Sequence, residues 1–270
     1  MDLIDYYVIE SYPFHLYVFT DEHLGSPLCY EEGLIKTIEI FNSDPIDKAF
    51  IGLGDKCALI DHKDKRWEGV YPGWLDVSRI IDSQIDRYIQ LYEPIKDYGI
   101  ILLEGGHENH IKRYMGVDPQ KRICDSLGIP GKTHSAFIDL HLRQGGKTRD
   151  TLRIYAHHGY IVAKTEDTKS AILSRYIKHS VSFNADLYLY GHCHQLRYDD
   201  SVISVEKYRK TLRMKRKIFA LCGGFEKAYS DTFSAYTERK GISFSDLGFM
   251  IFEITLNNNK VNIEIEKVRV

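Results

Sequence analysis

Hydrophobic residues along the chain fall into short blocks whose spacing changes between that of strands and that of helices. Apolar runs at 14–19, 48–54 and 99–103 are short and rich in aliphatic and aromatic residues, which predicts buried strands. The segments 31–41 and 77–92 repeat apolar residues every three or four positions, which predicts amphipathic helices. The first half of the chain is therefore predicted to alternate strands with helices.

The second half of the chain is dominated by paired strands. Segments 135–143 and 149–156 flank QGGKT and predict a hairpin, and 195–206 with 214–221 predict another. From residue 248 onward, two alternating stretches flank an NNNK turn. Three more elements are predicted: helices over 108–127 and 168–180, and a strand over 186–190. This order indicates an α/β chain with helices outside a mixed sheet system.

The chain is predicted to form a single domain, 1–270, because no repeat, low-complexity stretch or linker interrupts the pattern. Its composition, 43% hydrophobic and 27% charged, is typical of a soluble globular protein. No apolar run approaches the about 20 residues that a membrane-spanning helix needs, and the acidic, mixed start is not typical of a secretory signal. With a net charge of -2, attraction to nucleic acid or acidic membranes is expected only from a local patch.

The cysteines argue against a disulfide framework or a cysteine-rich zinc site. They are odd in number, lie far apart and form no CxxC pair. The five are Cys29, Cys57, Cys124, Cys193 and Cys222. We therefore expect a reducing, cytoplasmic setting and no membrane partner.

Short clusters of histidine and acidic residues follow five of the predicted strands, as TDEH, GLGD, EGGH, AHHG and GHCH. Sites in α/β folds form where the carboxyl ends of strands converge, so we expect these clusters to meet. Together with the three residues that follow EGGH, they hold seven of the 12 histidines: His23, His107, His110, His157, His158, His192 and His194.

The spacing within these clusters suits metal binding. Asp21 and His23 stand at positions i and i+2 of an extended segment, so their side chains point the same way, and His192 and His194 share that spacing. Asp55 follows a glycine, where a tight turn lets its carboxylate project from a strand end. Each cluster alone is more typical of a polar turn. The combination of carboxylates and imidazoles without thiolates indicates manganese, iron, zinc or a similar divalent ion.

The order of the clusters resembles the signature of the calcineurin-like metallophosphoesterases, which is D-x-H, G-D, G-N-H-E/D, H and G-H-x-H. The chain has Asp21-Glu22-His23, Gly54-Asp55, Gly105-Gly106-His107-Glu108, His157-His158-Gly159 and Gly191-His192-Cys193-His194. The resemblance runs from about residue 15 to the C-terminus, with FTDEHLGS and LYGHCH as close matches. The segment GGFEKAYSDTFSAYTERKG, followed by a strand at LGF, is similar to the phage- and prokaryote-type branch of that family.

The resemblance implies a four-layer α/β/β/α sandwich of two mixed sheets, with two divalent metal ions at the strand ends. Mn²⁺ is the preferred ion, with Fe, Zn, Ni and Mg as alternatives. The implied ligands are Asp21, His23 and His194 for the first ion, Asp55 between both ions, and His192 with either His157 or His158 for the second.

The resemblance also implies a mechanism. Two ions about 3.5–4 Å apart hold a phosphoryl oxygen and share a bridging water, which attacks phosphorus in line. His107 matches the histidine that stabilises the transition state or protonates the leaving oxygen, a role suited to a side chain that titrates near neutral pH. Asp55 and His107 are thus the expected catalytic residues, and no residue becomes covalently phosphorylated.

Gly106 departs from the family pattern, which has an asparagine here whose side-chain oxygen binds the second ion. Three interpretations remain open. Asn109 or His110, one helical turn later, replaces the missing ligand; water fills the position at a weaker second site; or the second site is lost, leaving a non-catalytic scaffold. A glycine also lets the backbone approach an ion or a substrate closely.

The segment KYRKTLRMKRK, residues 207–217, holds seven Lys or Arg residues on the hairpin that follows GHCH. It is interpreted either as an edge hairpin protected by charge or as a guide for a phosphate backbone beside the metals. The candidate nucleic-acid-binding residues are Arg209, Lys210, Arg213, Lys215 and Arg216, extended by Arg143, Lys147, Arg149 and Arg153 on the other hairpin. GIPGKTHS, residues 128–135, is predicted to be an ordinary loop, because Ser126 stands where a phosphate-binding loop needs glycine.

These observations predict a divalent-metal-dependent phosphoesterase acting on a phosphoester substrate. The basic segment favours a phosphodiesterase or nuclease, with nucleic acid as a partner. The alternatives are a nucleotide or protein phosphatase, and a degenerate module that binds metal or nucleic acid without catalysis.

Overall fold

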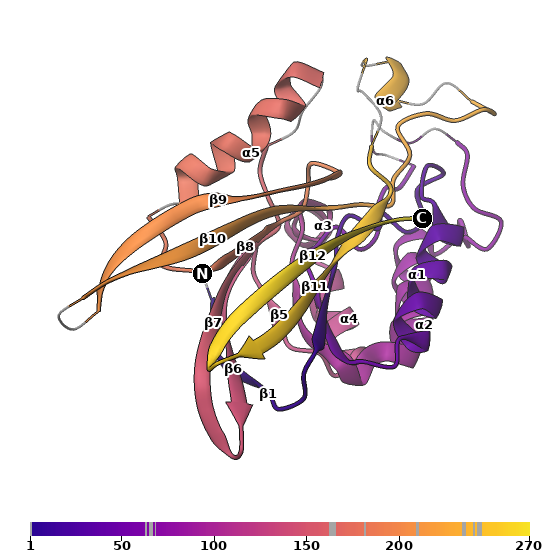
Figure 1. The fold of residues 1–270 in the computed structure, drawn as a ribbon. Coiled ribbons are helices and arrows are strands. Elements are labelled where there is room, and N and C mark those ends of the chain that lie inside the picture. The colour runs from indigo at the N-terminus through magenta and orange to yellow at the C-terminus, as the bar shows by residue number, and fades with distance from the viewer. Residues whose placement is uncertain are drawn as a thin grey trace.

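The computed structural model describes the chain except for residues 1, 63, 65, 66, 68, 162–165, 181, 209–210, 234–235, 240 and 242–244. Two six-stranded mixed sheets form its centre (Figure 1). Sheet 1 has the spatial order β1 (Asp2–Ile9), β6 (Ser135–Gln144), β7 (Lys147–His157), β8 (Leu187–Tyr190), β10 (Thr211–Gly223), β9 (Gln195–Tyr208). Sheet 2 has the order β12 (Lys260–Arg269), β11 (Gly248–Asn257), β2 (Phe14–Phe19), β3 (Asp47–Gly52), β4 (Gly99–Leu103), β5 (Gly131–Lys132).

The two sheets pack face to face, and helices cover their outer faces. Strand β2 shows why: Leu16 and Val18 belong to the aliphatic core between the sheets, whereas Tyr17 and Phe19 belong to an aromatic core under the helices. A strand covered on both faces has apolar residues at successive positions, which is what the sequence shows. The helices are α1 (Glu31–Ser43), α2 (Ile80–Tyr92), the 3-10 helix η1 (Glu93–Tyr98), α3 (Gly106–Met115), α4 (Pro119–Leu127), α5 (Glu166–Ser180) and α6 (Tyr236–Arg239).

The outer layers complete a four-layer α/β/β/α sandwich, as expected. Residues of α1, α2 and α4 pack on sheet 2, and Ile172 and Tyr176 of α5 pack on sheet 1. The predicted helix over 108–127 is two helices, because Gly116 ends α3 in a left-handed conformation and Pro119 begins α4. Among the described residues, no helix is both long and apolar enough to cross a membrane.

The parallel strands bring the polar clusters to one edge of the sandwich. Strands β2, β3 and β4 are parallel neighbours in sheet 2, and β7, β8 and β10 are parallel neighbours in sheet 1. The loops that follow β2, β3, β4, β7 and β8 carry the histidine and acidic clusters. The strand directions therefore explain why five distant segments meet.

Candidate metal centre

Left-handed backbone conformations concentrate in the loops that meet at this edge. Asp21, His23, Asp55, His192 and His194 have φ angles of 52°, 46°, 54°, 67° and 50°. A residue with a β-carbon adopts such a conformation at a cost of about 1–3 kcal/mol, so it persists only where its surroundings impose it. Five such residues in one place indicate a functional constraint on their side chains.

Glu108 ties the loop after β3 to the loop after β4. Its Oε2 accepts hydrogen bonds from the backbone N–H groups of Asp55 at 3.1 Å and Gly105 at 2.9 Å. Its Oε1 accepts from the Lys56 N–H at 2.8 Å and lies 3.5 Å from the Lys56 Nζ. Gly105 is required here, because a β-carbon would lie 2.1 Å from the Asp55 nitrogen. Glu108 thus holds Asp55 in place without facing the ligand groups itself.

We expect Glu108→Ala to lower the free energy of unfolding by about 3–5 kcal/mol, because it removes the carboxylate beside a buried ammonium group. Lys56 is only 1% exposed, and three backbone N–H groups also lose their acceptor. Urea unfolding in EDTA measures the change. Glu264→Ala, on an exposed position of β12, is the control and should stay within about 0.5 kcal/mol of wild type. Equal stability of the two variants would contradict this account.

The first ligand group consists of Asp21, His23 and His194. The Oδ1 of Asp21 lies 3.4 Å from the His194 Nε2 and 3.8 Å from the His23 Nε2, and the two Nε2 atoms are 3.2 Å apart. A tetrahedral ion with bonds of about 2.0–2.2 Å places its ligand atoms roughly 3.3–3.6 Å apart. This Oδ1 is buried and has no hydrogen-bond partner, so the group fits a divalent ion.

Asp21 is also oriented by its second carboxylate oxygen. Its Oδ2 accepts hydrogen bonds from the Thr20 hydroxyl and the His192 backbone N–H, both at 2.6 Å. A β-carbon at Gly191 would lie 2.1 Å from the Thr20 Oγ1, so glycine is needed for this approach. The GHCH loop and the TDEH loop are therefore joined through Asp21, which turns its Oδ1 toward the ligand group.

The second ligand group consists of Asp21, Asp55, His158 and His192, whose ligand atoms lie within 4.8 Å of one another. His158 Nδ1 is 2.9 Å from the Leu53 carbonyl oxygen, so Nδ1 carries the proton and Nε2 faces the Asp55 Oδ2 at 3.2 Å. That Nε2 is buried and has no hydrogen-bond partner. The donor set of two carboxylates and two imidazoles fits a second divalent ion, and Asp21 is shared with the first group.

His157 lies outside the ligand groups. It is the last residue of β7, and its Nδ1 accepts a hydrogen bond from the Gly159 N–H at 2.7 Å. Burial lowers the pKa of its imidazole to about 4, so the ring is neutral at physiological pH. Of the two histidines that the sequence left open, the structure brings His158 to the centre.

Neither residue named as a replacement for the missing asparagine reaches the ligand groups. The Asn109 side chain donates to the Glu104 Oε2 at 3.2 Å, and the exposed His110 ring packs on Tyr114 at 4.5 Å between centroids. Both lie on faces of α3 that point elsewhere. A β-carbon at Gly106 would lie 3.8 and 4.0 Å from the two carboxylate oxygens of Asp55, so position 106 itself faces the centre.

His107 lies beside both groups, and one of its nitrogens is within 4.8 Å of ligand atoms of His23 and Asp55. Its backbone N–H donates to the Asp55 Oδ1 at 2.8 Å. Its Nδ1 is in hydrogen-bond contact with the Ala58 carbonyl oxygen. Nδ1 therefore carries a proton, and Nε2 is the nitrogen that can serve a substrate oxygen.

The carboxylates control the protonation of the ligand histidines. Burial would lower the pKa of His158, but the Asp55 carboxylate outweighs it and raises that pKa to about 9. In the same way, burial would lower the pKa of His194, but Asp21 raises it to about 9. Burial would raise the pKa of Asp21, but the His194 imidazolium lowers it to about 2. Without metal, the pairs are therefore ion pairs at neutral pH.

Metal affinity is expected to rise with pH, because an ion binds only the neutral form of each imidazole. One proton must leave His194 for the first ion and one must leave His158 for the second, as long as the pH is below about 9. The apparent Kd of each ion should thus fall about tenfold per pH unit between pH 6.5 and 8.5. Calorimetry in two buffers of different ionisation enthalpy measures both the Kd and the protons released. His110→Asn is the control, and a pH-independent Kd would refute the prediction.

Glu226 is a residue of this centre that sequence reasoning missed. Its Oε2 lies 4.0 Å from the His23 Nε2, and its Oε1 accepts a hydrogen bond from the Ser26 hydroxyl at 2.9 Å. Burial would raise the pKa of Glu226, but the imidazoles of His23, His194 and His107 lower it. It follows β10 in the sequence GGFE, so the same pattern of strand end, glycine and acid could have identified it.

The described residues of the basic segment 207–217 do not lie beside the ligand groups, which corrects the expected placement. Strand β10 ends near the centre, where a β-carbon at Gly224 would lie 3.3 Å from the His194 ring. At about 3.3 Å per residue, Lys215 is roughly 25 Å from that end of the strand. The paired ends of β9 and β10, at Tyr208 and Thr211, lie away from the centre, because both strands run the length of the hairpin (Figure 1).

Four of the described cations of the two hairpins are also paired with carboxylates within the protein. Lys215 bonds Asp186 at 2.6 Å, and Arg216 bonds Asp200. On the β6–β7 hairpin, Arg153 pairs with Asp139 at 2.7 Å and Arg143 lies 3.8 Å from Glu10. Lys147 and Arg149 lie near the β6–β7 turn, at the far end of β7 from His157. Arg209, Lys210 and the side chain of Arg213 lie outside the described part of the chain.

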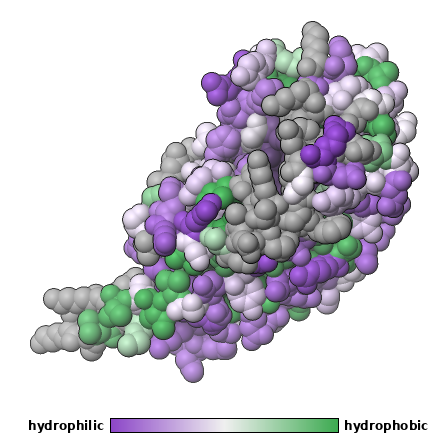
Figure 2. Space-filling view, turned by 90° about the horizontal axis from the view of Figure 1, so that it is seen from above, coloured by the Kyte–Doolittle hydropathy of each residue, from purple (hydrophilic) through white to green (hydrophobic). Residues whose placement is uncertain are grey.

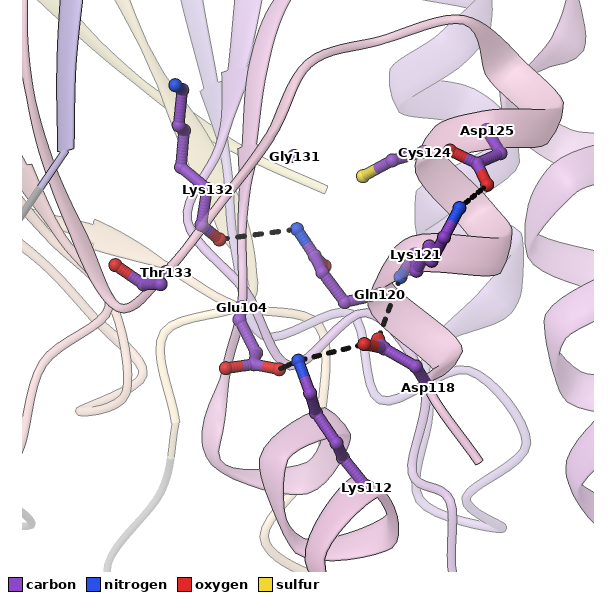
Figure 3. A pocket seen from close by; sticks show the side chains of 10 residues that line it. All are labelled: Glu104, Lys112, Asp118, Gln120, Lys121, Cys124, Asp125, Gly131, Lys132 and Thr133. Atoms are coloured by element: carbon purple, nitrogen blue, oxygen red, sulfur yellow. Dashed lines mark hydrogen bonds and ion pairs between the residues drawn. The ribbon is translucent and has the colours of Figure 1, made fainter. Parts of the chain in front are cut away.

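A pocket of about 390 Å³ lies on the flank of the Glu104–His107 loop, between α3, α4 and β5 (Figure 3). In the wall of this pocket, the Lys112 Nζ lies 3.4 Å from Glu104 and 2.8 Å from Asp118, so the charges that line the pocket largely balance. The GKT residues 131–133 line the opposite wall and lead into strand β6. A phosphate-binding loop leads into a helix, so the interpretation of this segment as an ordinary loop is consistent with the structure.

No family model matches the chain, and no curated protein matches it. A conserved protein of Streptococcus pneumoniae, described as a predicted phosphoesterase, is 12% identical with a TM-score of 0.35, over 94% of this chain and 88% of its own. Vps29 of Entamoeba histolytica complexed with zinc is 14% identical with a TM-score of 0.35, over 94% and 98%. A putative 5'-nucleotidase of Staphylococcus aureus is 10% identical with a TM-score of 0.45, over 95% and 54%. With TM-scores this low, these matches carry no weight for the function of this chain.

Proposed function

We propose that the chain is a divalent-metal-dependent phosphoesterase of the calcineurin-like metallophosphoesterase superfamily, in its phage- and prokaryote-type branch. The observation that carries the proposal is the pair of ligand groups that share Asp21, with Asp55 in the second group and His107 beside both. Two buried ligand atoms, the Asp21 Oδ1 and the His158 Nε2, face these groups without a hydrogen-bond partner. A bound ion would supply the partner that each of these atoms lacks.

Each residue of the centre would have its own role. Asp21, His23 and His194 would hold the first ion, and Asp55, His158 and His192 the second; the resemblance implies that Asp55 serves both ions. Bound divalent ions, with Mn²⁺ as our preferred choice, supply an activated water and neutralise charge on the phosphoryl group. His107 would direct its Nε2 to a substrate oxygen, either stabilising charge or donating a proton to the leaving oxygen. Glu108 and Glu226 position these residues.

We propose a phosphodiester as the substrate class, with nucleic acid as a candidate. The basic segment supports this proposal. Because the segment lies roughly 25 Å or more from the metal centre, only a substrate of about eight base pairs or longer could contact both the segment and the centre. The second candidate is a nucleotide or protein phosphatase, and the internal pairing of Lys215 and Arg216 favours it. A small substrate does not need the hairpin.

The proposal is tested by assaying the purified protein with a bis-aryl phosphodiester and an aryl phosphomonoester in Mn²⁺, Fe²⁺, Zn²⁺, Ni²⁺ and Mg²⁺ in turn. Saturable hydrolysis that EDTA abolishes and Mn²⁺ restores is the expected result. Preference for the diester, together with salt-sensitive cleavage of a 20-base-pair duplex but not of a six-base-pair duplex, would support the nuclease. Absence of hydrolysis with every metal would overturn the proposal in favour of a non-catalytic module.

Gly106→Asn is expected to tighten binding of the second ion by on the order of tenfold, because it adds an oxygen ligand at the position that faces Asp55. A side chain fits there, since its β-carbon would make only ordinary contacts with the carboxylate. Titration calorimetry with Mn²⁺ measures the two Kd values separately. Gly146→Asn, in the open β6–β7 turn, is the matched control. An unchanged second Kd would show that position 106 does not limit the site.

A further inference from the structure

The β9–β10 hairpin carries an exposed apolar stripe formed by Ile203, Val205, Leu212 and Met214. These side chains are 60%, 59%, 75% and 75% exposed. The hairpin projects beyond the body of the molecule (Figure 1), and Figure 2 shows hydrophobic residues gathered on this projecting end. Four large aliphatic residues at such exposure on one element are unusual for a monomer.

The stripe continues the face of sheet 1 that forms the core of the sandwich. Met214 pairs with Val205 across the hairpin. Along β10 the same alternation passes Arg216, which pairs with Ile203, and leads to Ile218 and Ala220, which are buried between the sheets. The opposite face of β10 points toward the α5 side, where the Lys217 Nζ donates to the Tyr188 hydroxyl. The stripe therefore belongs to the core-facing side of sheet 1 and extends beyond the area that sheet 2 covers.

Sheet 2 covers only the base of the hairpin. Near the centre, the Lys267 Nζ of β12 lies 5.7 Å above the Tyr198 ring. Farther along, nothing in the described part of the chain buries the stripe. Sheet faces of this kind pack against another sheet face about 10 Å away, so the hairpin lacks a second layer.

We propose that the stripe is the contact surface of a homodimer, in which two copies pack the same hairpin face to face about a twofold axis. A twofold contact is self-complementary, so the stripe serves as its own partner. In this twofold packing, the short, branched Ile203 and Val205 of one copy contact the long Leu212 and Met214 of the other. At these exposures the four residues offer roughly 500 Å² per copy, or about 1,000 Å² in the pair, which reaches the lower limit of a specific interface.

Charge supports a second copy over nucleic acid as the occupant. The net charge is only -2, so two copies repel each other weakly. The described cations next to the stripe, Lys215 and Arg216, are already paired with Asp186 and Asp200. An apolar face flanked by neutralised cations favours a protein surface of the same kind over a phosphate backbone.

Sedimentation equilibrium of the full chain between 1 and about 100 μM tests the dimer. We expect dimers for wild type, and at least a 100-fold weaker association for Leu212→Glu/Met214→Glu, because two buried carboxylates would face the partner's stripe. Val70→Glu/Val77→Glu, at exposed apolar positions elsewhere, is the matched control and should associate like wild type. A wild-type protein that stays monomeric at 100 μM overturns the proposal. The proposal is overturned in that case even if added nucleic acid or anionic vesicles are found to cover the stripe.

A cysteine cross-link gives a second measurement that does not depend on how the charged variant folds. Val205→Cys, in the middle of the stripe beside Met214, should form a covalent dimer with a short bismaleimide that spans two facing sheets, and Val77→Cys should not. Background is low because Cys29 is half-buried and the other cysteines are buried. Equal cross-linking of both variants also overturns the proposal. The stripe is roughly 25 Å or more from the centre, so hydrolysis of a small diester by the charged variant should stay unchanged, and this test is independent of the proposed function.

Discussion

Asp55→Asn is expected to lower kcat/KM for a bis-aryl phosphodiester by about 10³-fold, which corresponds to about 4 kcal/mol of transition-state stabilisation. Asp55 belongs to the second ligand group and also lies in a cluster with His23 and His107. Its Oδ2 is 3.2 Å from the His158 Nε2, and its Oδ1 accepts from the His107 N–H. The amide keeps one oxygen for the His107 N–H, so the loop is retained. It loses the negative charge that would join the ions.

Three measurements separate this loss from unfolding. Asp47→Asn, at the exposed opposite end of β3, is the matched control and should retain activity and thermal stability. Calorimetry should show weaker binding of the second ion. In the metal-free variant, NMR titration should give His158 a pKa below its wild-type value of about 9, because burial is no longer outweighed by Asp55. Undiminished hydrolysis by Asp55→Asn would refute the two-metal mechanism.

The fold was predictable where both faces of a strand are buried. Strands β2, β3 and β4 are continuous apolar runs, and their parallel order explains why the clusters after them meet. Strand β1 was not predicted, because Asp2 and Asp5 interrupt its apolar pattern, and its pairing with β6 depends on residues more than 100 positions away. Parallel pairing between distant segments leaves no local signal in the sequence.

The choice between His157 and His158 depends on where β7 ends. His157 still belongs to the strand and follows the alternation of Tyr155, which faces the α5 layer. His158 is the first residue past the strand, and its backbone N–H bonds the His134 carbonyl oxygen, which turns its side chain toward Asp55. A shift of one residue in the strand end would exchange the two histidines, and strand ends are what sequence patterns locate least well.

The basic segment shows a different limit of sequence reasoning. It follows the GHCH ligands closely along the chain, which suggested that it lies beside them. The 14 residues of β9 instead place its last residue, Tyr208, roughly 45 Å away. Nearness in sequence implies nearness in space only where the chain turns back, and here it turns back at the far end of the sheet.

His107→Ala is expected to lower kcat by about 10²–10⁴-fold while changing the Kd of either metal ion less than about threefold. Alanine keeps the backbone N–H that donates to the Asp55 Oδ1, so the ligand groups are preserved. What is lost is the imidazole whose Nδ1 contacts the Ala58 oxygen and whose Nε2 can serve a substrate oxygen. His110→Ala, on the exposed face of the same helix, is the matched control and should retain wild-type kcat.

The leaving group distinguishes the two roles open to His107. If its Nε2 donates a proton to the leaving oxygen, the variant should lose far more activity on an alkyl phosphodiester than on a p-nitrophenyl one, because p-nitrophenolate departs without protonation. If its role is to stabilise charge on the phosphoryl oxygens, the loss should be the same for both substrates. His107 lies beside His23 and Asp55 but belongs to neither ligand group, so its Nε2 would be available to a leaving oxygen and we expect the unequal loss. Full activity of His107→Ala on both esters would remove this residue from the mechanism.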